Sequence, residues 1–532
     1  MIRCLLILFF VSTISTLKAQ VSPAIQWQNA IGGKYAGYVN KMAPTNDGGY
    51  IVVGVVDTVN GIYMQNYHGD EDVWVAKLDK YCNIEWQKCY GSSGADYANI
   101  VIQTKDGGYI IGGEPGVNDG DVNGRHGGTG GDIWVLKLTY NGNLQWQKCL
   151  GGSDSDSPSS IKETIDGGYI VVGKTQSSDG DVKGLHYVWP YLNPDGWVVK
   201  LDSIGTIEWQ KCLGGNAPDV LNDILQIKDG SYVVAGATGS TDGDVTGNHG
   251  RADAWVVKLT NNGAIIWQKC YGGSDIDYAN IIKKKDDGGY ILAGGTLSND
   301  IEVSGNHGYE DMWVVKIDSI GNIEWQKCYG GSDLENLFGF ETTNDNGAVF
   351  CGVTHSKDGN ITGFHGYEDF WVVKIDSIGK IQWQRCLGGE YGGQAYDVYE
   401  TKDGGFLVGG ISGAQVGNGD VTVHINMDSN SITANWWVVK LAFENNALQI
   451  NTHNNQLQVY PNPAHDFVGI QTDNIKEIRI LDVAGRQYLH RTINTAENIY
   501  TYFNIQYLAR GVYIIQTIGN DGSIKVGELM VE

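Results

Sequence analysis

The chain has 532 residues, of which 75 are glycine and 9 are proline, and hydrophobic residues make up 42% of it. With 16 Trp and 29 Tyr the chain can fill a large core, which excludes a disordered protein, and its glycines follow no three-residue period, which excludes a collagen-like one. Its 37 basic and 61 acidic residues give a net charge of −24, which argues against nucleic acid or an anionic membrane surface as a partner.

The first predicted element is a signal peptide over residues 1–19. Arg3 precedes an apolar run from residue 4 to residue 11, and the small residue Ala19 stands before Gln20, as signal peptidase prefers. The apolar run is too short to span a bilayer, and no later stretch contains 18 consecutive apolar residues. We therefore expect an exported protein without a transmembrane segment.

A long repeat fills the next part of the chain. A Trp-Gln pair recurs seven times at spacings of 58 to 63 residues, a second Trp opens a Trp-Val-x-Lys pattern seven times, and an Asp-Gly or Asp-Asn-Gly turn recurs as often. The Trp-Gln pairs begin at Trp27, Trp86, Trp146, Trp209, Trp267, Trp325 and Trp383. The second pattern begins at Trp74, Trp134, Trp197, Trp255, Trp313, Trp371 and Trp437. A period this long and regular indicates a repeat architecture.

Each repeat is predicted to form four short strands. In the unit after Cys270 we expect them over residues 278–285, 289–295, 312–318 and 322–329, because β-branched and aromatic residues fill these stretches while Gly, Asp and Asn separate them. Four-stranded antiparallel units of this length indicate a β-propeller.

The two ends of the array predict that the propeller closes into a ring. The first unit begins with a lone fourth strand at residues 25–28, and the last unit stops after its third strand at residues 437–440. The N-terminal strand can therefore complete the last sheet and hide its edge. We expect an all-β chain: a seven-bladed β-propeller over residues 20–445, a linker over 446–456 and a small β-sandwich over 457–532.

The long loops between the second and third strands are the predicted binding face, because they lie opposite the tight hairpin turns. Unit three departs most from the repeat, with Tyr187, Trp189 and Tyr191 in an enlarged loop. Aromatic side chains can stack on sugar rings or anchor an interface, and Arg125 and Arg251 on neighbouring loops are candidate polar contacts. A loop that simply packs on its neighbour is the alternative interpretation.

A His and an Asp also recur in these loops. In four units the His precedes by four residues the Asp that stands two residues before the second Trp. The four pairs are His68 and Asp72, His249 and Asp253, His307 and Asp311, and His365 and Asp369. Neighbouring blades would hold equivalent atoms too far apart to share one zinc ion. We interpret the pairs as hydrogen bonds that fix the loop, which resembles the networks of WD-type propellers.

Asp-Gly-Asp sequences in three of the long loops leave two interpretations open. Their carboxylates are Asp119, Asp121, Asp179, Asp181, Asp242 and Asp244. Alternate carboxylates around a glycine can supply oxygen ligands to a structural calcium ion, although the full EF-hand spacing is absent. Asp and Gly are also the usual residues of tight turns. No other cofactor is expected.

From residue 457 the sequence follows a different pattern. Its motifs, in chain order, are Tyr460-Pro461-Asn462-Pro463, then Asp482 with Gly485 and Arg486, then Gly511-Val512-Tyr513, and a last strand is expected near residues 524–531. These motifs closely resemble the C-terminal sorting domain of type IX secretion cargo in Bacteroidetes. The resemblance implies that the type IX secretion machinery is a partner, and that the protein is exported to the cell surface or the medium. The repeats resemble the propeller repeats of such cargo.

The sequence contains no evident catalytic signature: no nucleophile elbow, HExxH motif, P-loop or pair of catalytic carboxylates stands out. We therefore expect a secreted or cell-surface binding protein without catalytic activity, with a glycan or a protein as its ligand. The alternative is a secreted hydrolase or lyase that acts on polysaccharides at the long-loop face of the propeller.

Overall fold

The computed structural model describes two compact units, Met1–Glu444 and Asn445–Glu532. In the first unit it describes residues 22–31, 36–57, 64, 66–128, 130–186, 193–413, 419–422 and 435–442. In the second it describes residues 457, 459–460, 464, 467–472, 475–482, 486–492, 499–506, 508–519 and 524–531. Every element among these residues is a β-strand. This part of the chain contains no helix with the length and apolarity needed to cross a membrane.

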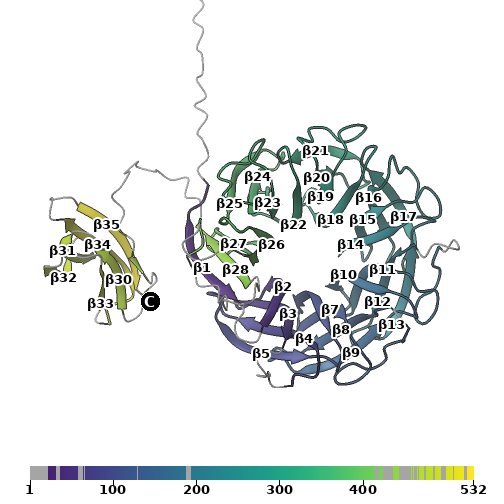
Figure 1. Cartoon of the computed structure of the whole chain (residues 1–532), viewed down its shortest axis with the longest axis horizontal. Helices are drawn as coiled ribbons and strands as arrows, with labels where there is room; N and C mark the ends of the chain where they lie inside the picture. Colours follow the sequence, from purple (N-terminus) through teal and green to yellow (C-terminus); the bar gives the residue numbers. More distant parts are fainter. Residues whose placement is uncertain are drawn as a thin grey trace, which may run out of the picture. The chain divides into compact units, whose positions relative to one another are not determined.

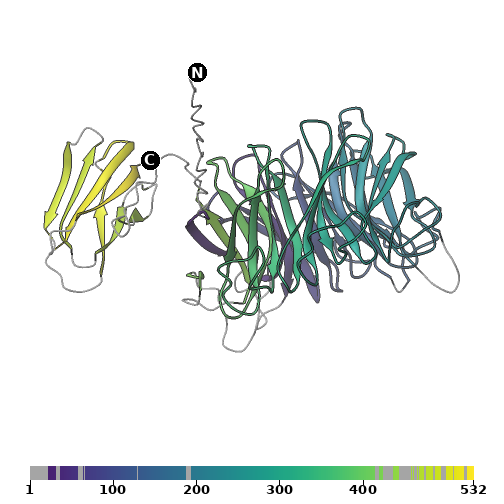
Figure 2. The ribbon, with the colours of Figure 1, turned by 90° about the horizontal axis from the view of Figure 1, so that it is seen from above.

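The first unit is a ring of four-stranded antiparallel sheets, or blades (Figures 1 and 2). Blade 1 contains β2 (Ala36–Pro44), β3 (Tyr50–Asp57), β4 (Glu71–Leu78) and β5 (Ile84–Tyr90). Blade 2 contains β6 (Tyr97–Gln103), β7 (Tyr109–Glu114), β8 (Ile133–Leu138) and β9 (Leu144–Leu150). Blade 3 contains β10 (Asp156–Glu163), β11 (Tyr169–Thr175), β12 (Asp195–Leu201) and β13 (Ile207–Leu213).

The next three blades repeat this order. Blade 4 contains β14 (Asp219–Gln226), β15 (Tyr232–Thr238), β16 (Asp253–Leu259) and β17 (Ile265–Tyr271). Blade 5 contains β18 (Asp277–Lys284), β19 (Tyr290–Thr296), β20 (Asp311–Ile317) and β21 (Ile323–Tyr329). Blade 6 contains β22 (Glu335–Thr342), β23 (Ala348–Thr354), β24 (Asp369–Ile375) and β25 (Ile381–Leu387).

Blade 7 joins the two ends of the array. It contains β26 (Gly393–Glu400), β27 (Phe406–Ser412) and β28 (Asn435–Leu441), and its fourth strand is the N-terminal β1 (Ile25–Ile31). β1 pairs antiparallel with β28, with Ala30 opposite Trp437. The predicted all-β propeller closed by its N-terminal strand is therefore confirmed.

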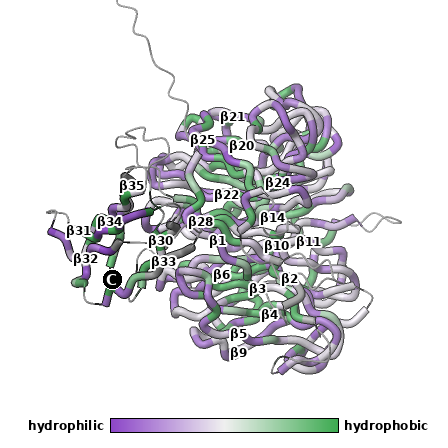
Figure 3. Tube along the Cα trace, turned by 60° about the vertical axis from the view of Figure 1, so that its left-hand side comes forward, coloured by the Kyte–Doolittle hydropathy of each residue, from purple (hydrophilic) through white to green (hydrophobic). Residues whose placement is uncertain are grey.

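The repeated Trp residues form the core of each blade. The third-strand indoles, such as Trp255 and Trp371, are fully buried, and the indole N–H of Trp255 donates to Gln268 at 2.8 Å. Gln268 belongs to the Trp-Gln pair, so the two recurring motifs are two halves of one contact. The other Trp of each unit packs between blades, as Trp86 does edge-on against Tyr109 of blade 2 at 5.8 Å between ring centroids. Hydrophobic segments accordingly coincide with the strands (Figure 3).

The Asp-Gly-Gly turns hold a buried lysine in most blades. In blade 1, Lys77 Nζ lies 2.8 Å from Asp47 Oδ2 and 3.0 Å from Glu85 Oε2. Although partial burial opposes the shift, hydrogen bonds from Lys77, Thr45 and Gly49 lower the pKa of Asp47 to about 2. The Asp-Gly-Gly motif thus combines a tight turn with an ion pair to the buried lysine of the Trp-Val-x-Lys motif.

The second unit is a small β-sandwich, as predicted. One sheet pairs β29 (Val459–Tyr460), β30 (Phe467–Thr472) and β33 (Ile499–Asn504). The other contains β32 (Gln487–Thr492), β31 (Ile475–Asp482), β34 (Gly511–Gly519) and β35 (Ile524–Val531). Val468 and Phe503 from the first sheet share one buried cluster with Ile480, Ile515 and Leu529 from the second. This shared core explains why the strands alternate apolar and polar residues.

Candidate ligand-binding channel

The centre of the ring holds a cavity of about 1030 Å³. The first strands of all seven blades line it: β2, β6, β10, β14, β18, β22 and β26. In Figure 1 the labelled members of this set, β2, β10, β14, β18, β22 and β26, face the middle of the ring. The cavity is at the upper end of the size range of small-molecule sites, which is about 300–1000 Å³.

A β-bulge in each innermost strand supplies the main lining residues. In β10 the pairing with β11 skips from Pro158 to Ser160, and in β14 the pairing with β15 skips from Leu221 to Asp223. The skipped residues are Asn40, Asn99, Ser159, Asn222, Asn280, Phe338 and Tyr396, which we call the bulge ring. All seven line the cavity. Bulges are a common way to re-aim side chains at a binding site.

Three ion pairs cross between neighbouring blades inside the cavity. Lys41 of blade 1 lies 2.6 Å from Asp397 of blade 7. The other two pairs are Lys162 with Asp223 at 3.0 Å, and Lys283 with Glu341 at 2.9 Å. Burial alone would raise the pKa of Asp223, but Lys162 and Lys283 lower it below its ordinary value. The charges of the lining are therefore largely compensated within the protein.

Amide side chains of the bulge ring are held in one orientation. Asn40 Nδ2 donates to the backbone oxygen of Ala98 at 2.9 Å, Asn222 Nδ2 to that of Ala279 at 3.0 Å, and Asn280 Nδ2 to that of Leu337 at 3.0 Å. Each bond links a blade to the next one. Asn280 Oδ1 also accepts from Asn222 Nδ2 at 3.4 Å, so these bonds join blades 4, 5 and 6 in one series.

An aromatic stack forms one wall of the cavity. The rings of Phe338 and Tyr396 lie 5.0 Å apart at an interplanar angle of 25°, and Tyr396 stacks in turn on Trp436 at 5.7 Å. Tyr399, which also lines the cavity, donates to the backbone oxygen of Met42 at 2.5 Å and so ties blade 7 to blade 1. Blades 6 and 7 therefore give the channel an aromatic side.

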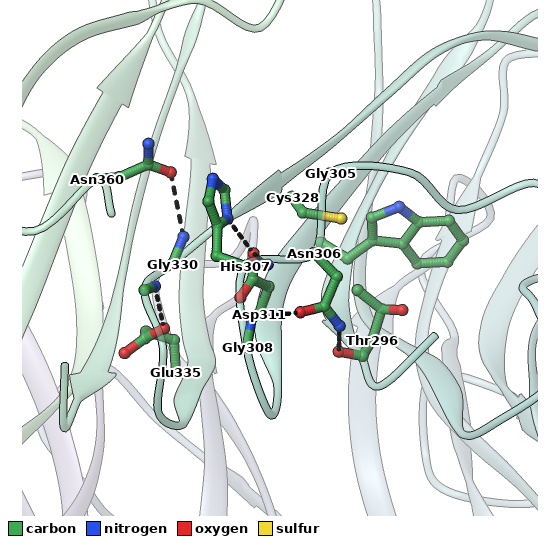
Figure 4. Close-up of polar contacts among 12 residues, drawn as sticks. Thr296, Gly305, Asn306, His307, Gly308, Asp311, Cys328, Gly330, Glu335 and Asn360 are labelled. Carbon is green, nitrogen blue, oxygen red and sulfur yellow. Dashed lines mark hydrogen bonds and ion pairs between the residues drawn. The ribbon is translucent and has the colours of Figure 1, made fainter. Parts of the chain in front are cut away.

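On the long-loop face, a His and a buried Asp form the same contact in six blades. His Nδ1 lies 2.6 to 3.0 Å from the Asp Oδ2, and the His backbone N–H donates to the same oxygen, as Figure 4 shows for His307 in blade 5. The six pairs, which we call the loop-face clasps, are His68–Asp72, His126–Asp132, His186–Asp195, His249–Asp253, His307–Asp311 and His365–Asp369. Burial raises the pKa of Asp195 to about 6 despite the two bonds from His186.

Four clasps also face a carboxylate of the following blade. His68 Nε2 lies 3.7 Å from Asp121, and His126 Nε2 lies 3.5 Å from Asp181. The corresponding distances are 3.9 Å from His186 to Asp244 and 3.8 Å from His365 to Asp420. The second carboxylate of each Asp-Gly-Asp sequence therefore lies at a contact between blades.

The first carboxylate of each Asp-Gly-Asp sequence binds the link between blades. Asp119 Oδ1 accepts the backbone N–H of Ser93 at 2.7 Å, Asp179 Oδ1 that of Ser153 at 2.7 Å, and Asp242 Oδ1 that of Asn216 at 2.8 Å. The two carboxylates of each sequence thus have different partners. Among the residues that the structure describes, no three His, Cys, Asp or Glu side chains come together as a metal-binding group.

Of the residues predicted to bind ligand on the long-loop face, the structure describes only the two arginines. Tyr187, Trp189 and Tyr191 lie outside the described residues. Arg125 Nη2 donates to Gly130 of its own loop at 2.6 Å, and Arg251 Nη1 lies 3.2 Å from Asp275. Neither arginine lines the cavity.

The bulge ring was not predicted from the sequence. The sequence does contain a sign of it. One position in each first strand holds Asn, Ser, Phe or Tyr, whereas the motifs of the other three strands are nearly constant between units. The units therefore differ in their innermost strands as well as in their loops.

Residues 458–532 match the family described as the secretion system C-terminal sorting domain. Of its predicted motif residues, Tyr460 ends β29, Asp482 ends β31 and Gly511 begins β34, followed there by Val512 and Tyr513. Arg486 directly precedes β32, while Pro461, Asn462, Pro463 and Gly485 lie outside the described residues. The chain thus carries a type IX sorting domain, which indicates export.

Solved structures with a similar fold have low sequence identity to this chain. The Pan2 WD40 domain of Neurospora crassa is 11% identical with a TM-score of 0.43, and covers 80% of this chain and 98% of its own. YCF48 from Cyanidioschyzon merolae is 8% identical with a TM-score of 0.38, and covers 79% of this chain and 99% of its own. No curated protein matches the sequence.

Proposed function

We propose that this protein is an exported binding protein without catalytic activity, whose ligand occupies the central channel. The sorting domain at residues 458–532 and the signal peptide expected over residues 1–19 both support export by the type IX route, to the cell surface or the medium. The ring itself supplies a rigid cavity of about 1030 Å³.

The observation that carries the proposal is the bulge ring. Its seven positions are equivalent in the backbone, yet they hold Asn, Ser, Phe and Tyr, while the surrounding repeat keeps its Trp, Gln and Lys residues. A side chain that served only the scaffold would be as uniform as the third-strand Trp. Variation at positions that line a cavity is what recognition of an asymmetric ligand requires.

The charged groups of the channel favour binding over hydrolysis. A general acid in a glycosidase needs a raised pKa so that it keeps its proton near neutral pH. Asp223 has a lowered pKa because of Lys162 and Lys283, and Asp397 accepts both Lys41 and the backbone N–H of Met42. The alternative, a polysaccharide hydrolase or lyase, gains no support from these carboxylates.

The loop-face clasps and the Asp-Gly-Asp carboxylates fit a structural role. Their partners are His side chains and backbone N–H groups of the same ring, and several bonds join neighbouring blades. On this interpretation these contacts stabilise the packing between blades and need no calcium ion.

The test narrows the channel from an exposed position. Ser159 faces the cavity and is exposed, so Ser159→Trp should place a large side chain in the channel without disturbing the core. We expect the wild-type full-length protein to bind a member of a mixed array of neutral and charged oligosaccharides and peptides, and Ser159→Trp to weaken that binding about tenfold or more.

The matched control is Tyr140→Trp on a hairpin turn, where Tyr140 is 72% exposed. This variant should bind as the wild type does. Binding retained by Ser159→Trp, or turnover of a bound oligosaccharide by the wild type, would contradict the proposal.

A further inference from the structure

We infer that the ligand of the central channel is a neutral, hydroxyl-rich carbohydrate, an inference that rests on the proposed binding function. A sugar ring has two apolar C–H faces and a periphery of hydroxyl groups. The channel offers both kinds of surface, with an apolar wall on one side and polar side chains around the rest of its lining.

The apolar wall belongs to blades 6 and 7. Phe338 of β22 lines the cavity from blade 6, with Tyr396 of β26 stacked beside it. Across the centre of the ring in Figure 1 lies the blade that contains β7 and β8, which contributes the exposed Asn99 and the partly buried Ile102 to the lining. An aromatic or aliphatic surface can pack on the C–H face of a sugar, and aromatic rings at such sites contribute strongly to affinity.

Polar side chains occupy the rest of the lining. Blades 3 to 5 contribute Ser159, Asn222 and Asn280, and blades 1 and 2 contribute Asn40 and Asn99. The Nδ2 groups of Asn40 and Asn222 donate to backbone oxygens, so their carbonyl oxygens can accept hydrogen bonds from a ligand, whereas Asn280 Oδ1 already accepts from Asn222 Nδ2 at 3.4 Å. A ligand with many hydroxyl donors at its edge satisfies these acceptors.

The balance of charge argues for a neutral ligand. The lining contains Lys41, Lys162 and Lys283, and each lies within 3.0 Å of a carboxylate of a neighbouring blade. A strongly charged ligand would have to compete with one of these pairs, and breaking a partly buried pair leaves an uncompensated charge. A ligand hydroxyl can instead donate to Glu341, which is the most exposed of the three paired carboxylates at 30%.

The experiment compares oligosaccharides of similar length and different charge on the full-length protein. The neutral probes are cellohexaose, laminarihexaose, mannohexaose and hexa-N-acetylchitohexaose, and the charged probes are the chitosan hexamer and hexagalacturonate. Isothermal titration should show that at least one neutral hexamer binds about tenfold or more tightly than either charged hexamer.

Two variants locate the binding within the channel. Phe338→Ala removes part of an apolar wall and should weaken the neutral hexamer about tenfold or more. Asn99 is an exposed member of the bulge ring, so Asn99→Leu should weaken it several-fold without a change in melting temperature, even if Phe338→Ala folds poorly. The aromatic control is Tyr309→Ala, where Tyr309 is 61% exposed and lies outside the cavity lining.

The outcomes separate this inference from the proposed function. If a charged hexamer or a peptide binds, and Ser159→Trp weakens that binding while the neutral hexamers do not bind, the channel is a binding site and the carbohydrate assignment is wrong. If a neutral hexamer binds wild type and Ser159→Trp equally, the site lies elsewhere and the channel assignment is wrong. No binding of any neutral hexamer overturns the inference.

Discussion

The loop-face clasps and the bulge ring occur once per blade, yet the first is nearly uniform and the second varies. The clasp uses the same His and Asp in six blades. Its surroundings are tightly packed, since a Cβ on the neighbouring Gly330 would lie 2.5 Å from both Asp311 Oδ1 and Glu335 Oε2. The bulge ring faces a cavity, which has room for side chains of different size. Uniform positions therefore support the ring, and varied positions are available for recognition.

The largest effect should come from a uniform core position. Trp255 is fully buried in the core of blade 4, and its indole N–H bonds to Gln268. We expect Trp255→Ala to lower the free energy of unfolding by about 3–5 kcal/mol, through lost contacts and a cavity. Urea denaturation should detect this change. Asn99→Leu in the bulge ring is the comparison and should change stability by less than about 0.5 kcal/mol.

The pH dependence of a clasp gives the next test. The pKa of Asp195 is about 6 in the folded protein, against about 3.9 in an unfolded chain. The folded state thus holds the proton more tightly, so this group stabilises the protein below pH 4, and that contribution is lost as pH rises through 6. Between pH 4 and pH 7, we expect the free energy of unfolding of the wild type to fall by about 2 kcal/mol relative to that of Asp195→Asn. Parallel stability curves for the two proteins would contradict the raised pKa.

A smaller loss of stability should follow from adding one methyl group beside a clasp. Gly330→Ala places a Cβ against two buried carboxylates, which must move apart. Overpacking of this kind costs about 1–3 kcal/mol. Thermal melting measures the loss. The control is Gly131→Ala, because Gly131 has no positive φ and the nearest atom to its Cβ, Glu114 Oε2, would be 3.4 Å away. An equal or larger loss in the control would show that contact with the clasp does not determine the cost.

Chelation should have no effect if the Asp-Gly-Asp carboxylates serve only the ring. Asp119, Asp179 and Asp242 each accept a backbone N–H from the link between blades. We therefore expect the same melting temperature with EDTA as with added calcium. A lower melting temperature in EDTA that calcium restores would establish the calcium interpretation instead.

The sequence predicted the propeller because its repeat is encoded by large residues at fixed spacing. Trp255 and Gln268 recur in every unit as partners, and the truncated ends showed how the ring closes. The clasps were predicted where the spacing is four residues. His126–Asp132 and His186–Asp195 have the same geometry at separations of six and nine residues, because loop insertions change the spacing without changing the contact.

The channel was harder to predict because it depends on strand register. Whether Ser159 faces the cavity or the neighbouring blade depends on a bulge of one residue, and Pro158 and Ser160 carry no local mark of it. A shift of one residue reverses the face of every later side chain in a strand. Composition and periodicity do not fix that shift, whereas the pairing of β10 with β11 does.

Closure by β1 also sets the order in which the molecule can be completed. Ile31 pairs with Trp436, so the earliest part of the propeller to emerge from a ribosome or a translocation pore must wait for almost the last. Until then, the edges of β28 and of β1 are unpaired and can pair with other chains. A contact between residues so distant in sequence forms slowly, because the intervening chain must first be brought together. The strand that closes the finished ring is therefore unpaired until the rest of the propeller has been synthesised or exported.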